Sequence, residues 1–417
     1  MDDKVLQKPV IKDYGESVVT ANSGTSYTID LTQGNVFYIT LTGDCAFTFS
    51  NPSPSGDSCT LTLILVQDST GAHTATWPAA VRWPSGTGPT LSTAANALDI
   101  CVFATVNGGA TWFGTMSAQG YDAYLWTGVY IPYGYFGGGY GPRSSVSRVD
   151  YSNDTATAAV KGPLSSARYS PAATGSSSYG YFGAGSNFPS AFSRVDRIDY
   201  SNDTATAVAK GPLSLARYYL SAAGNSSYGY FGGGYSPLIS RIDRVDYAND
   251  TATAAIKGPL SVARSQLAAT GNSSYGYFGA GALPSFASRV DRVDYASDAS
   301  TATAKGPLSV ARTYLAATSS SSYGYFGGGQ FSTTLVDRVD YANDTATAVA
   351  KGPLSVARLL HAATSSSSYG YFGAGLAPGL SSSVDRFDYS NDTATAALKG
   401  PLPATNAGLG GTNHNPL

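Results

Sequence analysis

The sequence predicts an all-β fold, and its composition is the first reason. Only 12% of the 417 residues are charged, about half the usual share, and Glu occurs once, as Glu16. Gly (48) and Tyr (30) are abundant. The chain lacks the usual helix formers and is rich in residues typical of strands and turns. This composition argues against a helical bundle, and the net charge of −2 argues against nucleic-acid binding through bulk positive charge.

The first third of the chain contains no repeat and divides into three parts. Residues 1–16 hold most of the clustered charge and are predicted to form an N-terminal arm. Residues 17–118 show alternating apolar positions, which predict a β-sandwich-like module of about 100 residues. Its strands are expected at Ser26–Leu31, Val36–Thr42, Ala46–Ser50, Thr60–Gln67, Ala97–Thr105 and Thr111–Met116. Residues 119–132 are expected to form a linker.

The three cysteines of the chain, Cys45, Cys59 and Cys101, lie in residues 17–118. Their odd number and their spacing fit neither a disulfide framework nor a zinc site, so we expect the chain to fold in a reducing cytoplasm. No apolar run approaches the roughly 18 residues of a membrane span. The first residues also lack the apolar core of a secretory signal. We therefore expect no membrane insertion.

A repeated unit fills the rest of the chain, residues 133–417. The string Tyr-Gly-Tyr-Phe-Gly-Gly/Ala-Gly begins at Tyr133, Tyr179, Tyr228, Tyr275, Tyr323 and Tyr369, at spacings of 46, 49, 47, 48 and 46. Each unit is predicted to contain four short strands separated by turn residues. We name them a (Ala-Arg-x-x-x-Ala-Ala-Thr), b (Tyr-Gly-Tyr-Phe-Gly), c (Asp-Arg-Val-Asp-Tyr) and d (Thr-Ala-x-x-x-Lys).

Four short strands in a unit of about 40–50 residues are typical of a propeller blade. A single sheet of this kind exposes both faces, so the blades are expected to stack in a ring. The predicted fold is an N-terminal β-sandwich-like module followed by a six-bladed β-propeller of four-stranded blades.

The last unit indicates how the ring closes. Residues 401–412 align without gaps on residues 259–270 and form a degenerate strand a. The first unit lacks a clear strand a of its own, so we expect the C-terminal tail to supply it. Residues 124–130 are the alternative donor.

Two family resemblances follow from these motifs. Strand b ending in Gly-Gly, then Asp-Tyr, a polar turn and Pro-Leu-x-x-Ala-Arg resembles the kelch repeat, over residues 133–417. Kelch repeats usually place a Trp after the turn, where this chain has Thr-Ala-Thr-Ala, so inter-blade packing is expected to rely on the Tyr and Phe of strand b and the Tyr of strand c. The first module resembles one found in bacteriophage tail-fibre and virion appendage proteins. The residues that carry this second resemblance include Phe47-Thr48-Phe49-Ser50-Asn51-Pro52, Thr74-Ala75-Thr76-Trp77-Pro78, Val81-Arg82-Trp83-Pro84 and Asn107-Gly108-Gly109-Ala110-Thr111-Trp112.

The second resemblance implies a phage virion structural protein, a tail-fibre or appendage subunit assembled in the host cytoplasm. It implies contacts with other virion or tail proteins through the N-terminal module. Fibre proteins of this kind are often trimers, so a homo-oligomer, preferentially a trimer, is expected.

Catalysis is not expected, because the required groups are missing. The three His residues, His73, His361 and His414, do not recur from unit to unit, and a single Glu excludes paired-Glu chemistry. The Asp residues of strand c, such as Asp196 and Asp199, recur and are interpreted as turn caps and partners of the repeated Arg. We predict no cofactor, no metal and no enzymatic activity; a glycan-active propeller enzyme is the alternative that these absences oppose.

Ligand binding is expected on the face that carries the b–c loops and the d-to-a connections. The b–c loops vary in length on a repeated scaffold, which is where specificity usually resides. Their candidate contact residues are Tyr140, Phe188, Phe192, Leu238, Phe286, Phe331 and Leu380. The same face is predicted to carry a basic ring, Lys161, Lys210, Lys257, Lys305, Lys351 and Lys399, with the repeated Arg paired to Asp and the Lys left solvated. The expected partner is a host surface glycan or protein; the alternative is a purely architectural role toward a neighbouring virion protein.

Overall fold

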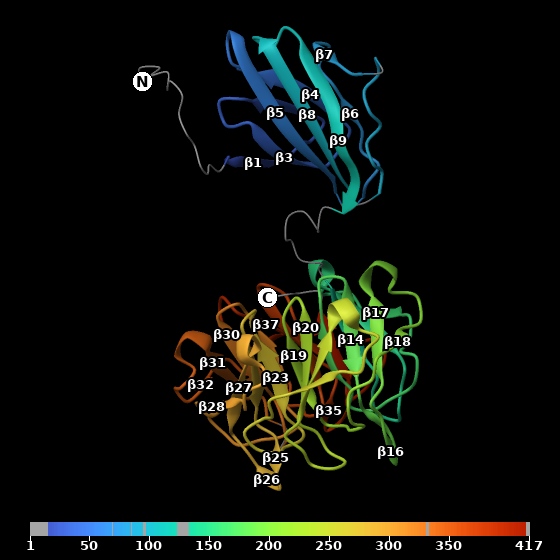
Figure 1. The fold of residues 1–417 in the computed structure, drawn as a ribbon, viewed down its shortest axis with the longest axis vertical. Coiled ribbons are helices and arrows are strands. Elements are labelled where there is room, and N and C mark those ends of the chain that lie inside the picture. The colour runs from blue at the N-terminus through green and yellow to red at the C-terminus, as the bar shows by residue number, and fades with distance from the viewer. Residues whose placement is uncertain are drawn as a thin grey trace. The chain divides into compact units, whose positions relative to one another are not determined.

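The computed structural model describes residues 16–68, 70–84, 86–94, 97–122, 133–330 and 333–413. The chain divides into two compact units, Met1–Val129 and Tyr130–Leu417, which are described separately. Figure 1 shows that both are built from strands. The helices in the described parts are single 3₁₀ turns, η1 (Tyr151–Asn153), η2 (Tyr200–Asn202), η3 (Tyr247–Asn249), η4 (Tyr295–Ser297) and η5 (Tyr341–Asn343). The all-β prediction is confirmed.

The N-terminal unit consists of two sheets, with strand orders β1-β3-β5-β8-β9-β7 and β2-β4-β6. The strands are β1 (Val18–Asn22), β2 (Ser26–Asp30), β3 (Val36–Leu41), β4 (Cys45–Ser50), β5 (Ser55–Gln67), β6 (Ala75–Thr76), β7 (Val81–Arg82), β8 (Ala97–Asn107) and β9 (Trp112–Asp122). Each of the six strands expected from the sequence is present. The sequence reasoning missed β1, β6 and β7.

The first six strands alternate between the two sheets, and within each sheet they pair in parallel. Strand β1 pairs with β3 and β3 with β5, while β2 pairs with β4 and β4 with β6. The chain therefore coils through two stacked sheets. Strands β8 and β9 extend the larger sheet in antiparallel order, and β7 pairs in parallel with β9 at its edge. Apolar alternation predicts strands but not this coil, because it does not report which strands pair.

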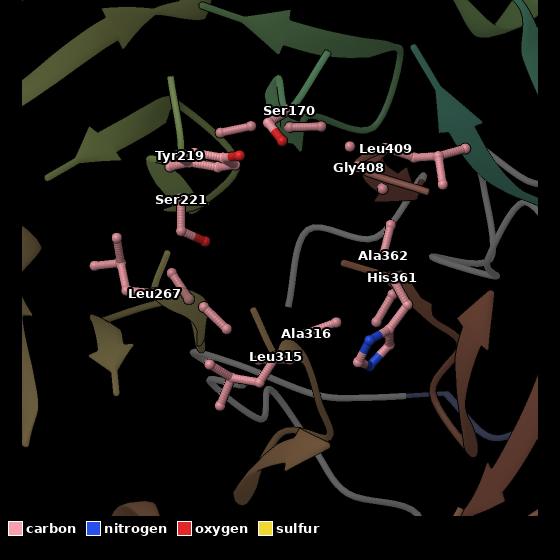
Figure 2. A pocket seen from close by; sticks show the side chains of 18 of the residues that line it. Ser170, Tyr219, Ser221, Leu267, Leu315, Ala316, His361, Ala362, Gly408 and Leu409 are labelled. Carbon is pink, nitrogen blue, oxygen red and sulfur yellow. The ribbon is translucent and has the colours of Figure 1, made fainter. Parts of the chain in front are cut away.

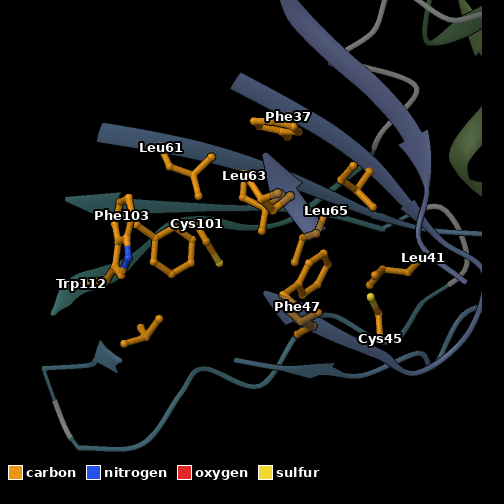
Figure 3. Close-up of a cluster of buried hydrophobic side chains, with 14 of the residues drawn as sticks. Phe37, Leu41, Cys45, Phe47, Leu61, Leu63, Leu65, Cys101, Phe103 and Trp112 are labelled. Carbon is orange, nitrogen blue, oxygen red and sulfur yellow. The ribbon is translucent and has the colours of Figure 1, made fainter. Parts of the chain in front are cut away.

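Alternate side chains of these strands fill the space between the two sheets (Figure 3). Leu61, Leu63 and Leu65 of β5 point into this core, and each is at most 1% exposed. Trp77 packs against Trp83 with ring centroids 5.2 Å apart, so the two Trp-Pro pairs of the sequence meet at one edge of the core. The three cysteines are buried and free.

The C-terminal unit is a propeller of six four-stranded blades in the described residues, as predicted. Its a strands are β39 (Gly410–Asn413), β13 (Ala172–Gly175), β19 (Ser221–Gly224), β23 (Ala268–Gly271), β29 (Ala316–Ser319) and β33 (Ala362–Ser365). Its b strands are β10 (Tyr133–Gly137), β14 (Tyr179–Gly183), β20 (Tyr228–Gly232), β24 (Tyr275–Gly279), β30 (Tyr323–Gly327) and β34 (Tyr369–Gly373). Its c strands are β11 (Val146–Asp150), β17 (Val195–Asp199), β21 (Ile242–Asp246), β27 (Val290–Asp294), β31 (Val336–Asp340) and β37 (Val384–Asp388). Its d strands are β12 (Ala159–Lys161), β18 (Val208–Lys210), β22 (Ala255–Lys257), β28 (Thr303–Lys305), β32 (Val349–Ala350) and β38 (Ala397–Lys399).

The C-terminal tail closes the ring. Strand β39 pairs antiparallel with β10, with Tyr135 opposite Thr412 and Gly137 opposite Gly410. The first blade therefore has the order β12-β11-β10-β39, with three strands from the start of the propeller and one from its end. This confirms the tail as the donor. The alternative donor, residues 124–130, lies outside the described residues.

The a strands surround a central channel, and the blades pack against one another around it. The packing uses strand b and the Tyr after strand c, as predicted: Tyr181 stacks on Tyr247 of the next blade at 4.7 Å. The strand-b glycines lie between blades, where a Cβ on Gly183 would stand 2.6 Å from the Phe231 ring.

The b–c loops and the d-to-a connections share one end of the propeller, which we call the loop face. Backbone bridges join the two sets of segments, as between Arg143 and Arg168 and between Tyr218 and Tyr235. Three loops form small hairpins that the sequence reasoning missed. They are β15 (Ser186–Asn187) with β16 (Ser190–Ala191), β25 (Ala282–Leu283) with β26 (Ser285–Phe286), and β35 (Leu376–Ala377) with β36 (Gly379–Leu380). In Figure 1 the labels β16, β25, β26 and β35 fall at the same end of the propeller.

Candidate functional site

The repeated lysines belong to a charged cluster between blades. At the first junction the hydroxyl of Tyr135 (3.0 Å), the guanidinium of Arg148 (2.8 Å) and the ammonium of Lys161 (3.0 Å) all donate to the carboxylate of Asp203 in the next blade. We call this carboxylate the hub Asp. The hub residues of the six junctions are Asp203, Asp250, Asp298, Asp344, Asp392 and Asp154.

The prediction that the six Lys are solvated charges is therefore wrong. Their side chains are 12–19% exposed, and each ammonium lies about 3 Å from a hub carboxylate. Five of the hub residues are the Asp of an Asn-Asp-Thr turn, and the sixth, Asp298, lies in Ser-Asp-Ala. The proposed basic ring of Lys161, Lys210, Lys257, Lys305, Lys351 and Lys399 thus consists of ion-paired groups that stabilise the blade junctions.

A second repeated ion pair lies inside each of the five blades whose strand a precedes strand b in the sequence, that is, every blade except the closing one. Arg217 and Asp243 are fully buried and 2.8 Å apart, and Ser214 donates to the same carboxylate through its hydroxyl at 2.6 Å. The same pairing joins Arg168 to Asp196, Arg264 to Asp291, Arg312 to Asp337 and Arg358 to Asp385. This confirms that the repeated Arg pairs with the repeated Asp. The second strand-c Asp caps the following turn, as Asp199 does by accepting from the N–H of Ser201.

The mouth of the channel on the loop face is a ring of six equivalent residues, two positions after the repeated Arg. They are Ser170, Tyr219, Gln266, Tyr314, Leu360 and Gly408, all with left-handed φ between 50° and 61°. Hydrogen bonds between neighbours hold the ring: the N–H of Leu360 donates to the Tyr314 carbonyl at 2.9 Å. Inside it is a cavity of about 120 Å³, seen in Figure 2. Left-handed backbone costs a non-Gly residue free energy, so the blades hold these side chains at a fixed angle.

Aromatic side chains gather beside this mouth in a continuous cluster, which we call the aromatic patch. It comprises Tyr140, Tyr169, Phe188, Tyr218, Tyr219, Tyr235 and Tyr314, with ring centroids of successive neighbours 4.9–5.9 Å apart. Tyr140, Phe188 and Tyr235 are 57%, 53% and 49% exposed. Burial raises the pKa of Tyr218, Tyr219 and Tyr314, so their phenols stay protonated at neutral pH. The patch offers rigid apolar faces with hydroxyl groups at their edges.

The residues expected to contact a ligand fall into several groups. Tyr140 and Phe188 belong to the aromatic patch. Phe192 and Leu238 are half-buried, and Phe331 lies outside the described residues. Phe286 (38% exposed) and Leu380 (37%) lie on the hairpins of other blades. Two of the seven candidate contact residues of the b–c loops therefore belong to the aromatic patch. That any of these seven residues contacts a ligand stays a prediction.

Sequence reasoning missed most of the aromatic patch. Tyr169, Tyr218, Tyr219 and Tyr314 occupy the unspecified positions of Ala-Arg-x-x-x-Ala-Ala-Thr. Those positions were counted as part of strand a, although variable aromatic residues inside an otherwise constant repeat are a signal of their own. Tyr235 lies in a b–c loop and was passed over.

Positive charge on the loop face comes from four arginines that the repeat pattern did not indicate. The guanidinium groups of Arg194, Arg241 and Arg289 donate to Ser hydroxyls, and that of Arg143 donates to the Thr405 carbonyl. The b–c loops and d-to-a connections contain no Asp or Glu. Because these segments carry Arg and no acidic residue, their charge favours anions.

Over the described ranges, no group of three or more His, Cys, Asp or Glu side chains is placed to hold a metal ion. In the same residues, no helix is long and apolar enough to cross a membrane. His361 lines the channel at a position where other blades have Leu220, Leu267 and Leu315, and it is 5% exposed. Burial, together with the nearby Arg358, lowers its pKa to about 3, so it is neutral at physiological pH.

These features define a class of protein: a six-bladed propeller with a variable, aromatic loop face, joined to a coiled two-sheet module. Residues 19–110 match the family "Putative phage tail fibre C-terminal domain". No curated protein matches the chain. The family match indicates a phage structural protein of the tail-fibre type, associated with the virion. A structural family and a propeller fold both point to a non-enzymatic role.

Proposed function

We propose that this protein is a tail-fibre or appendage subunit whose propeller binds a glycan on the host cell surface. The observation that carries the proposal is the aromatic patch, where three half-exposed rings are held by four more buried ones around the channel mouth. Soluble proteins rarely leave such a cluster exposed without a partner. Here the two left-handed tyrosines, Tyr219 and Tyr314, fix part of the cluster in place.

A glycan suits the chemistry of this surface. Sugar rings present C–H faces that stack on aromatic rings and hydroxyl groups that accept from phenols and guanidinium groups. Tyr supplies rigid contact area at a low cost in conformational entropy. The loops of the same face contain no acidic residue, which favours a neutral or anionic glycan over a cationic ligand.

The N-terminal unit would then connect the propeller to the virion. We propose that it contacts other virion or tail proteins and that the chain assembles as a homo-oligomer, with a trimer as the preferred state. The tail-fibre family match over residues 19–110 supports this role. Light scattering of the purified chain tests it, and a monomer at micromolar concentration would contradict it.

Binding to host cells tests the function of the propeller. The purified chain should bind host cells and block infection, and exchanging loop 186–195 for the shorter loop 330–336 should abolish both effects. The matched control exchanges loop 282–290, which contains none of the seven residues that define the aromatic patch, and should keep both. If the unaltered chain does not bind cells, the propeller serves to dock a neighbouring virion protein.

A further inference from the structure

The closing blade has a cavity beside the position where each of the other five blades holds a buried Arg–Asp pair. This cavity has a volume of about 520 Å³, in the range of small-molecule sites. It lies between the first b–c loop and the C-terminal tail, and its lining includes Phe136, Arg143, Ser147, Pro403 and Asn406. We call it the closing-blade cavity.

The cavity results from three replacements at once. Where the third blade has Ser214, Arg217 and Asp243, the closing blade has Pro403, Asn406 and Ser147. Asn406 keeps one contact of the missing Arg: its amide donates to the Gly138 carbonyl at 3.0 Å, as Arg217 donates to the equivalent Gly233 carbonyl at 2.9 Å. No group in the closing blade replaces the rest of the Arg217 guanidinium or the Asp243 carboxylate. The space that this buried ion pair fills in the third blade is therefore open in the closing blade.

The groups around this space are polar and available. Among the described residues, no hydrogen bond engages the hydroxyls of Ser144, Ser145 and Ser147, which all line the cavity. Within the same described residues, the guanidinium of Arg143 makes one hydrogen bond, to the Thr405 carbonyl at 3.3 Å, which leaves its other N–H groups for a ligand. Val160, which is 67% exposed, supplies an apolar wall, and the buried Phe136 lies behind the lining.

We propose that the closing-blade cavity binds an acidic sugar residue. The guanidinium of Arg143 would pair with the sugar carboxylate, since Arg matches carboxylate geometry with two parallel donors. The three Ser hydroxyls would bind the sugar hydroxyls, and Val160 would face its C–H groups. This site adjoins the aromatic patch, because Asn406 accepts from the backbone N–H of Tyr140 at 3.1 Å. No ring of the patch lines the cavity, and its occupancy does not depend on the function proposed for the patch.

The test uses the full chain with glucuronate as the probe and glucose as the neutral control, by saturation-transfer NMR and titration calorimetry. Glucuronate should bind at least tenfold more tightly than glucose. The triple variant Ser147→Asp, Pro403→Ser, Asn406→Arg restores the ion pair of the other blades and should lose this binding while still melting cooperatively. Arg143→Gln should keep the cavity but lose the preference for glucuronate.

Three results would overturn the proposal: no glucuronate binding by the unaltered chain, unchanged binding by the filled triple variant, or an unchanged preference in Arg143→Gln. If the triple variant does not fold, the Arg143→Gln result decides. Tyr219→Ser removes a central ring of the aromatic patch and places there the residue found at Ser170. It should keep glucuronate binding, so failure of the aromatic patch and failure of this cavity are distinguishable.

Discussion

The ammonium of Lys399 in the last blade lies 3.1 Å from the carboxylate of Asp154 in the first blade. Tyr371 and Arg386 reach the same carboxylate from the last blade. The junction that closes the ring is thus the same as the five others, although the chain is covalently open there. The hub and strand β39 together make the last junction equivalent to the rest.

Replacing the closing hub should destabilise the propeller. In Asp154→Asn the cations of Arg386 and Lys399 lose their carboxylate while remaining largely buried, and we expect a loss of roughly 3 kcal/mol in the free energy of unfolding. The matched control is Asp150→Asn, which keeps a capping side chain at η1 and should cost much less. Urea unfolding measures both; equal effects would contradict the role of the hub.

Removing the closing strand should have a larger effect. Deletion of residues 403–417 removes β39, which pairs with β10 and leaves that strand at an open edge. We expect a clear fall in the melting temperature of the propeller or loss of its cooperative transition. Deletion of residues 414–417, which follow β39, serves as the control. An unchanged melting curve after the longer deletion would remove the closure mechanism.

The buried pair of Arg217 and Asp243 should behave as one unit. Either Arg217→Asn or Asp243→Ser alone leaves a buried charge without its partner, and we expect a cost of about 3–5 kcal/mol for each. The double variant reproduces the residues of the closing blade and should cost less than the sum of the two. A double-mutant cycle by urea unfolding measures the coupling, and strictly additive effects would show that the pair is not coupled.

His361 should make stability depend on pH in the acidic range. The folded state holds this His neutral down to a pKa of about 3, whereas the unfolded chain protonates it below 6.5. The unfolded state therefore binds more protons between these values, and stability should fall by up to about 1.4 kcal/mol for each pH unit below 6.5. In His361→Leu, which restores the residue of other blades, this contribution should vanish. Equal pH dependence in both proteins would show that His361 is not responsible.

The sequence predicts the propeller well because its signal is repeated. The constant residues of the repeat, such as Tyr181, Arg217 and Asp243, serve the blades, and their recurrence defines strands, blade number and closure. The pairing of Lys161 with Asp203 could not be predicted, because it joins different blades through a turn that runs between them. The parallel coil of the N-terminal unit was also hidden, since alternation reports which residues face the core and not which strands are neighbours.

The candidate site was harder to predict than the fold, because its residues are not repeated. Its residues differ from blade to blade, so Tyr169, Tyr218 and Tyr219 do not stand out from a pattern. Their contacts exist only once blades one to three are placed side by side. The closing-blade cavity likewise arises because Ser147 and Asn406, far apart in the chain, depart from the repeat together.

The measurement that tests the account most directly is binding of the full chain to surface polysaccharide extracted from host cells. The test variant changes the three exposed rings, Tyr140→Ser, Phe188→Ser and Tyr235→Ser, and the control variant changes Phe286→Ser and Leu380→Ser on other blades of the same face. Both should keep the melting temperature of the unaltered chain. We expect the test variant to lose at least tenfold in affinity and the control variant to bind as the unaltered chain does. Equal binding by the two variants, or no binding by the unaltered chain, would contradict a glycan-binding role for the aromatic patch.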